Sequence, residues 1–166
     1  MQILVLYYSR SGNTKKLAEA VLRGIEEVDE VKGLLRSTAE VTREDFVDSA
    51  GILAGSPTYF GGMAAPLKDV FDRFVGIRKD MEGKVGAAFA TAGDPSGGKE
   101  TTMLSILQAM LIYGMIVVGD PLEATGHYGT ACQGVPDDTA EENAQKLGRR
   151  VANITRRLFS GQTEKK

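Results

Sequence analysis

Short apolar runs alternate along this chain with longer stretches in which apolar residues recur every three or four positions. The apolar runs are typical of buried strands, and they span residues 3–8, 31–35, 52–55, 85–90 and 115–118. The stretches between them are typical of amphipathic helices, with apolar faces at Leu17, Val21, Ile25 and Val28; at Leu67, Val70, Phe71 and Phe74; at Met103, Leu107, Met110 and Leu111; and at Leu147, Val151, Ile154 and Leu158. The chain is therefore predicted to repeat a strand-then-helix unit five times, with no apolar helical face marked between the second and third strands.

This repeat predicts an α/β fold of three layers, in which helices cover both faces of a mostly parallel sheet. Strands made only of apolar residues are buried on both faces, and each parallel strand returns through a right-handed helical crossover. Ligands of such sheets bind outside the carboxyl ends of the strands. The candidate functional loops therefore span residues 9–14, 56–62, 91–99 and 120–136.

Composition narrows the class of protein without indicating a function. The 166 residues are predicted to form one domain over residues 1–160, followed by a polar tail over 161–166. With 42% hydrophobic and 25% charged residues, the chain is a typical globular protein, and its net charge of -2 favours neither nucleic acid nor an acidic membrane surface. No signal peptide or membrane span is predicted, and Cys132 has no second thiol for a disulfide or a cysteine-based zinc site. We expect a cytoplasmic protein.

The loop after the first strand has the composition of a phosphate site. It reads Ser9-Arg10-Ser11-Gly12-Asn13-Thr14 and leads directly into a predicted helix. Backbone N–H groups at a helix N-terminus attract anions, the hydroxyl groups can donate further hydrogen bonds, and the glycine lets the backbone approach the ligand. The same residues also suit an ordinary helix cap and turn without a ligand.

The loop after the third strand carries two aromatic residues, Tyr59 and Phe60, between Pro57-Thr58 and the pair Gly61-Gly62. A flat ring could stack on either aromatic side chain, while backbone N–H groups bind polar atoms at the edge of that ring. The alternative is that both aromatic side chains pack onto the end of the sheet.

The loop after the fourth strand matches the first part of a nucleotide-binding P-loop, since Gly93 to Lys99 fits G-x-x-x-x-G-K. The next residue is Glu100, where a P-loop requires a serine or threonine, and its carboxylate would repel phosphate. NTP hydrolysis is therefore not predicted. Thr91, Ala92 and Gly93 instead leave room at the strand end for the edge of a ring.

His127 is the one histidine of the chain. It has no histidine partner for a metal site and no nucleophile beside it, so no metal is expected. It is either a solvated loop residue or a group that guides a substrate or donates a proton near neutral pH.

Two other classes of α/β protein are excluded because the chain lacks their motifs. A phosphoacceptor receiver domain needs acidic residues where Tyr7-Tyr8-Ser9 and Ala54-Gly55-Ser56 stand, and a Rossmann domain needs three glycines where residues 9–14 hold one. A mononucleotide phosphate suits the first loop better.

Together the three loops resemble the FMN site of the flavodoxin-like superfamily. Residues 55–63, 98–102 and 127–129 look most like those of WrbA-type NAD(P)H:quinone oxidoreductases. The resemblance covers about residues 2–159. It implies a flavodoxin-like fold of strand order 2-1-3-4-5, noncovalent FMN, and two-electron reduction of quinones by NADH or NADPH in a homodimer or homotetramer. The resemblance implies that the FMN phosphate binds at Ser9, Arg10, Ser11, Gly12, Asn13 and Thr14. It implies that the flavin ring binds at Pro57, Thr58, Tyr59, Phe60 and Gly61, with further ring contacts from Thr91, Ala92 and Gly93. It also implies that His127 and Tyr128 lie near the ring.

The chain departs from these enzymes at two places. The segment 37–49 is shorter than in the longer members of the family, which bears on tetramer contacts. Ile112-Tyr113 stands where a histidine pair is frequent, which bears on the substrate pocket.

Two other functions stay open: a flavodoxin-type carrier of single electrons between proteins, and a non-catalytic interaction protein. Flavodoxins are typically strongly acidic, whereas this chain carries a net charge of only -2.

Overall fold

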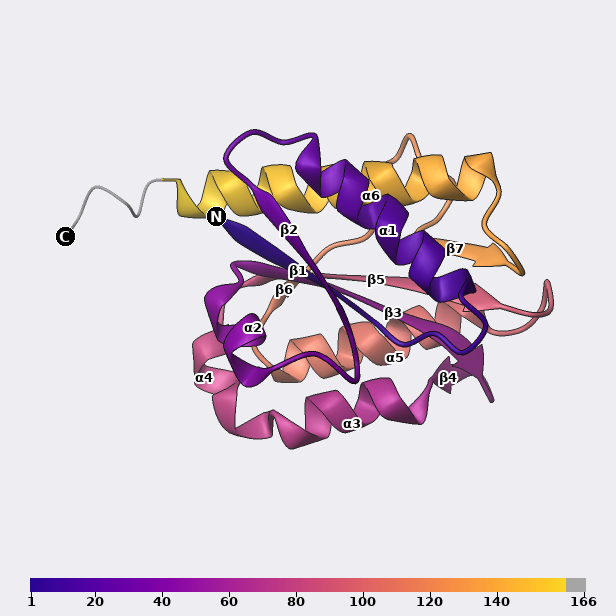
Figure 1. Cartoon of the computed structure of the whole chain (residues 1–166), viewed down its shortest axis with the longest axis horizontal. Coiled ribbons are helices and arrows are strands. Elements are labelled where there is room, and N and C mark those ends of the chain that lie inside the picture. Colours follow the sequence, from indigo (N-terminus) through magenta and orange to yellow (C-terminus); the bar gives the residue numbers. More distant parts are fainter. Residues whose placement is uncertain (161–166) are drawn as a thin grey trace.

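The computed structural model describes residues 1–160, and the predicted polar tail, residues 161–166, lies outside the described residues. Figure 1 shows a sheet between two helical layers, with α1 and α6 on one face and α3 and α5 on the other. The strands are β1 (Gln2–Tyr7), β2 (Lys32–Ser37), β3 (Gly51–Tyr59), β4 (Gly62–Met63), β5 (Val85–Ala92), β6 (Ile116–Val117) and β7 (Gly129–Gln133). The helices are α1 (Asn13–Glu26), α2 (Arg43–Asp48), α3 (Ala65–Arg73), α4 (Arg78–Met81), α5 (Lys99–Ile112) and α6 (Asp138–Phe159), with one 3-10 turn at Val75–Ile77.

The order of the sheet is β2-β1-β3-β5-β6, and each of these pairs is parallel. The predicted three-layer α/β class and the order 2-1-3-4-5 are confirmed, because β5 is the fourth of the strands predicted from the sequence and β4 is only the short second strand of a hairpin. The fifth position is shared by β6 and β7, which both pair with the outer edge of β5. β6 lies opposite Val85 and Gly86, and β7 lies opposite Ala88 to Ala92.

The single fifth strand predicted over residues 115–118 is therefore only half of the observed edge. Residues 118–128 leave the sheet and return to it as β7. The sequence did not indicate β7 because Gly-Thr-Ala-Cys-Gln lacks the continuous apolar run of the other strands. One of its faces is buried only in part, so it needs fewer apolar residues.

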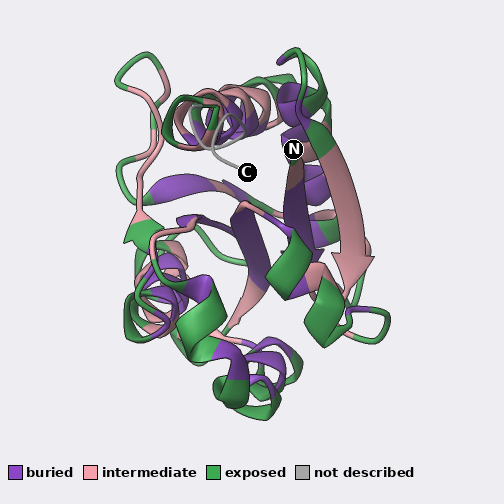
Figure 2. Ribbon diagram, turned by 90° about the vertical axis from the view of Figure 1, so that its left-hand side faces the viewer, coloured by how far each residue is buried: buried purple, intermediate pink, exposed green. Residues whose placement is uncertain are grey.

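Both faces of the central strands are buried, as their continuous apolar runs predict. Leu4 and Leu6 belong to the core under α3 and α5, while Ile3 and Val5 belong to the core under α1 and α6. Figure 2 shows this as buried residues along the central strands and on the helix faces turned toward them.

The helices α1 and α6 cross backbone to backbone. A Cβ added to Gly148 of α6 would lie only 2.2 Å from the carbonyl oxygen of Val21, and one added to Gly24 of α1 would lie 2.0 Å from that of Gln145. Only glycine permits this approach. The crossing fixes α1 against the sheet and so fixes the position of its N-terminus.

The segment predicted as an aromatic loop after a short third strand is a β-hairpin. β3 continues to Tyr59 and pairs with β4 in antiparallel register, with Thr58 opposite Met63 and Tyr59 opposite Gly62. The two turn residues, Phe60 and Gly61, both have positive φ angles, 50° and 76°, as in a type I′ turn. Pro57 does not end the strand, because it keeps its place opposite Thr91 of β5.

Candidate functional site

Three of the predicted loops meet at the carboxyl ends of β1, β3 and β5, which are neighbours running in one direction. The start of α1, the β3–β4 hairpin and the loop after β5 gather at the right-hand end of Figure 1. A hydrogen bond of 2.8 Å between the Oγ1 atoms of Thr14 and Thr91, both buried, joins the first loop to the third. The structure thus brings together residues that the sequence separates widely.

The first loop ends at an open helix N-terminus. Gly12 is the N-cap of α1, its φ is 92°, and no side chain caps the first turn of the helix. The Gly12 N–H donates to Ser9 Oγ over 3.1 Å, so the Ser9 hydroxyl proton is free to be donated elsewhere. A Cβ on Gly12 would meet no atom within 4 Å, and the first turn holds no acidic residue. These features suit an anion such as a phosphate monoester.

The Thr14 and Thr91 pair adds one more donor to this end of the sheet. Two hydroxyl groups carry two protons, and their mutual hydrogen bond uses only one of them. The second proton is available to an acceptor on a ligand, or to a neighbouring carbonyl group.

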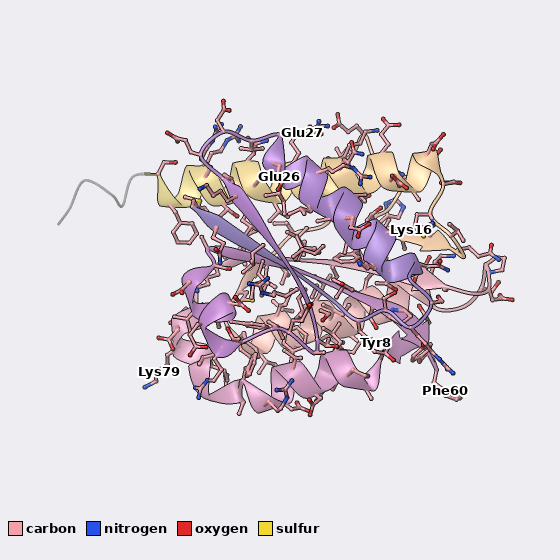
Figure 3. All side chains as sticks on the ribbon, in the orientation of Figure 1. Tyr8, Lys16, Glu26, Glu27, Phe60 and Lys79 are labelled. Carbon is pink, nitrogen blue, oxygen red and sulfur yellow. The ribbon has the colours of Figure 1, made fainter. Side chains whose placement is uncertain are left out.

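The hairpin presents an exposed aromatic residue at its tip. Phe60 is fully exposed and holds a left-handed backbone conformation that a bulky residue rarely adopts. Figure 3 shows Phe60 extending away from the body of the protein. Tyr59 is partly exposed and meets Tyr8 edge to face, with 6.5 Å between ring centroids. The predicted alternative, that both aromatic side chains pack onto the sheet, is therefore wrong for Phe60.

Helix α5 holds the hairpin in place. Thr102 Oγ1 donates to Thr58 Oγ1 over 3.0 Å, and Ser105 Oγ accepts a hydrogen bond of 3.1 Å from the Met63 N–H. At the N-cap of α5, a Cβ on Gly98 would lie 3.2 Å from the Cα of Gly61. The hairpin and the third loop are thus in contact. Thr102 belongs to the stretch 98–102 that carries the family resemblance, but no signal in the sequence linked Ser105 to the site, because its role depends on how α5 crosses the hairpin.

The third loop folds back on itself before α5 begins. The Ser96 N–H donates to the Asp94 carboxylate over 2.9 Å, and the Lys99 ammonium group donates to the Pro95 carbonyl over 2.9 Å. Lys99 is thus engaged within its own loop and does not act as a P-loop lysine. Thr91 and Ala92 are buried at the end of β5, while Gly93 is exposed with open space beside its Cα.

His127 lies at the outer edge of the sheet, beside the first turn of α5. It sits where residues 118–128 rejoin the sheet: a Cβ on Gly119 would lie 2.4 Å from the His127 carbonyl oxygen, and the nearby Gly129 pairs with Ala88 in the middle of β5. Its exposed side chain lines a hollow of about 200 Å³ with the first turn of α5 and with Tyr128. This hollow includes no residue of the first loop or the hairpin. Residues 118–128 come before β7, and residues 134–136 follow it at the carboxyl ends of the strands.

Two other polar groups that could do chemistry are held inert by burial. Burial, reinforced by the charge of Asp137 and opposed by Lys99, raises the pKa of the Cys132 thiol to about 11, so the thiol is neutral near pH 7. Tyr113 stands where the related enzymes often carry a histidine of the substrate pocket. In this structure it lies at the end of α5, away from the loops. Its hydroxyl donates to the Phe71 carbonyl over 2.7 Å. Since α5 is about 20 Å long, Tyr113 does not line the candidate site.

Within residues 1–160, no group of three or more metal-ligating side chains lies close enough to hold an ion. In the same part of the chain, no helix is both long and apolar enough to cross a membrane.

The fold and site together define the class of protein as a flavodoxin-like α/β protein with a candidate mononucleotide site at the carboxyl ends of its strands. A structure described as a flavodoxin, WrbA-like protein from Agrobacterium tumefaciens matches with a TM-score of 0.81 and 24% identity, covering 94% of this chain and 98% of that one. That likeness supports the fold.

Sequence comparison identifies the family. The model of the NADPH-dependent FMN reductase family matches residues 31–129. A flavodoxin from Aquifex aeolicus is 34% identical, and the match covers 98% of this chain and 91% of that flavodoxin. An NAD(P)H dehydrogenase (quinone) from Archaeoglobus fulgidus is 35% identical, and the match covers 95% of this chain and 98% of that protein. The chain belongs to the NADPH-dependent FMN reductase family, so the predicted resemblance to FMN-linked oxidoreductases of this fold is confirmed.

Proposed function

We propose that this protein is an FMN-dependent oxidoreductase that passes two electrons from NADH or NADPH to a quinone-type acceptor. The observation that carries this proposal is the meeting of an open, uncapped helix N-terminus with an exposed aromatic hairpin at one end of the sheet. The former suits a phosphate and the latter suits a flat ring, which are the two ends of FMN.

The residues present fit FMN. In this proposal the phosphate binds the first-turn N–H groups of α1 and the hydroxyl groups of Ser9, Ser11 and Thr14. The ring lies between the hairpin, residues 57–61, and the third loop at Thr91, Ala92 and Gly93. Asn13 at the first position of α1 completes the phosphate site. The open space beside Gly12 supports this assignment, since it leaves room for an anion against the backbone.

Bound FMN supplies the redox chemistry, in which NAD(P)H, a proton and a quinone become NAD(P)⁺ and a hydroquinone. The protein then needs to bind and orient the partners rather than to provide an acid or base. Its aromatic hairpin would hold the flavin ring so that the nicotinamide, and later the quinone, can stack against that ring. Residues 1–160 would form one domain for this purpose, in a cytoplasmic homodimer or homotetramer whose size light scattering measures.

The test is an absorbance spectrum of the purified protein loaded with FMN, followed by anaerobic addition of NADH or NADPH. Bleaching of the flavin bands, and recovery of the colour on addition of menadione, are expected. A protein that binds no FMN would contradict the proposal at its first step.

The second candidate is a flavodoxin-type electron carrier, which the 34% identity to the Aquifex aeolicus flavodoxin favours. A carrier would keep its flavin bands in the presence of both nicotinamides and lose them only with dithionite. The same titration therefore decides between the two functions. A catalytic role for His127 is tested by His127→Gln, which leaves the rate unchanged if the histidine is only solvated.

A further inference from the structure

A hollow lies between the first loop and the hairpin. It has a volume of about 490 Å³, and its walls are Arg10, Tyr59, Phe60, Met63 and Ala65. This volume is within the range of small-molecule sites. Arg10 is the one residue of the first loop that lines it.

The walls of this hollow combine one full positive charge with apolar and aromatic surface. Met63 and the rings of Tyr59 and Phe60 provide the apolar part, and none of the five lining residues is acidic. Such a set of groups is complementary to a flat aromatic molecule that carries a negative charge.

Arg10 is free to bind such a molecule. Within residues 1–160 its guanidinium group makes no hydrogen bond, ion pair or cation–π contact, and the side chain is exposed. Other arginines are engaged: Arg23, Arg73 and Arg149 each pair with a carboxylate at 2.7 Å or less. Arg10 therefore has all its donors available, in a fork that matches the oxygens of a carboxylate, sulfonate or phosphate.

We propose that this hollow binds the anionic group of a substrate whose ring stacks at the hairpin, and that Arg10 is the residue that selects for this charge. The proposal rests on the proposed function and extends it by naming the substrate class. It also assigns Arg10 to the substrate rather than to the FMN phosphate, which is the role that the family resemblance implies.

Two sources could supply the same chemistry. One is the acceptor, as a quinone that carries an acidic substituent. The other is the electron donor, through the diphosphate that NADH and NADPH share. One Arg10 variant can distinguish these sources when it is assayed with several substrates. The charge of the acceptor can be removed while its ring is kept, whereas NADH and NADPH both keep the diphosphate.

The test compares Arg10→Gln with Lys16→Gln in the FMN-loaded protein. Lys16 is a suitable control because it is an exposed cation of the nearby helix α1 that does not line the hollow (Figure 3). For each protein, KM is measured for menadione, for naphthoquinone sulfonate, for NADH and for NADPH. Loss of one charge-assisted contact predicts a rise in KM of about tenfold or more in Arg10→Gln, with partial rescue by Arg10→Lys.

A rise in KM for the sulfonated quinone alone supports binding of an acidic acceptor. An equal rise for NADH and NADPH, with both quinones unchanged, supports binding of the diphosphate. Unchanged KM values for all four substrates overturn the proposal, as does an equal rise for the neutral and the sulfonated quinone. A weaker affinity for FMN in Arg10→Gln also overturns it, because Arg10 would then belong to the FMN phosphate.

A binding measurement keeps this test separate from the proposed function. Naphthalene sulfonate and uncharged naphthol are titrated into the FMN-loaded protein by calorimetry, without any turnover. Tighter binding of the sulfonate that disappears in Arg10→Gln supports the site even if neither nicotinamide is oxidised. Equal affinity of wild type and Arg10→Gln for the sulfonate overturns the site even if the enzyme is active.

Discussion

Thr14 and Thr91 are separated by 77 residues in the chain, and their side-chain oxygens lie 2.8 Å apart. Thr14 is in the first turn of α1 and Thr91 is near the end of β5, so this one hydrogen bond joins the proposed phosphate loop to the proposed ring-binding loop. Both side chains are buried, with 1% and 4% of their surfaces exposed.

Replacing either threonine by valine is expected to destabilise the fold. Each single variant leaves one buried hydroxyl without its partner, which costs about 1–2 kcal/mol. The double variant Thr14→Val/Thr91→Val removes both hydroxyls, so its loss of unfolding free energy should be smaller than the sum of the single losses. Urea unfolding of the four proteins measures this, and strictly additive losses would show that the bond adds no stability.

Gly12→Asp is expected to abolish FMN binding, because the new carboxylate would lie against the phosphate. Gly83→Asp is the matched control. Gly83 also has a positive φ, 78°, with open space beside it, and it lies before β5 at the opposite end of the sheet. Backbone strain and added charge are thus the same in both variants. Fluorescence titration with FMN should show normal binding by Gly83→Asp only; loss of binding by both would attribute the effect to strain.

Phe60→Asn is expected to stabilise the protein and to weaken substrate binding. Phe60 has a φ of 50°, a conformation that costs an ordinary residue about 1–2 kcal/mol, and Asn-Gly is the preferred sequence for a type I′ turn. Thermal unfolding should therefore shift upward while KM for the quinone rises. Leu122→Asn, which removes another fully exposed apolar side chain, should leave KM unchanged. An unchanged KM in Phe60→Asn would remove Phe60 from the substrate site.

Tyr113→Phe is expected to change how stability depends on pH. Burial, together with the charge of Asp72, raises the pKa of Tyr113 to about 12 from an ordinary value of 10.0. The folded state thus holds the phenolic proton more tightly, so its contribution is complete below about pH 10 and is lost as the pH rises toward 12.

At pH 8 the variant should be less stable by about 1 kcal/mol, since the Phe71 carbonyl loses its donor. This gap should narrow as the pH is raised above 10, because only the wild type has a phenol to ionise. Urea unfolding at a series of pH values measures the gap. A gap that stays constant through this range would mean that Tyr113 titrates normally.

The three layers, the parallel sheet and the gathering of three loops could be predicted from the sequence because they follow from local patterns, whereas the strand order 2-1-3-4-5 came from the resemblance to flavodoxin-like proteins. Continuous apolar strands such as Ile3 to Leu6 demand cover on both faces, and helical crossovers then make their neighbours parallel. Parallel strands end at one edge, which brings residues 9–14 and 91–93 together. The hairpin and β7 were not predicted, because Pro57 and Gly129 are typical of loops when read locally.

By itself, the sequence determined the layers of this protein, the family to which it belongs and the end of the sheet where its candidate site lies, because apolar periodicity and short motifs are properties of neighbouring residues. Only the tertiary structure decided which side chains share a space. It placed Arg10 in a hollow with Tyr59 and Phe60, moved His127 to the edge of the sheet and set Tyr113 in the core. The direction of a side chain depends on the packing of distant segments, and no local pattern encodes that.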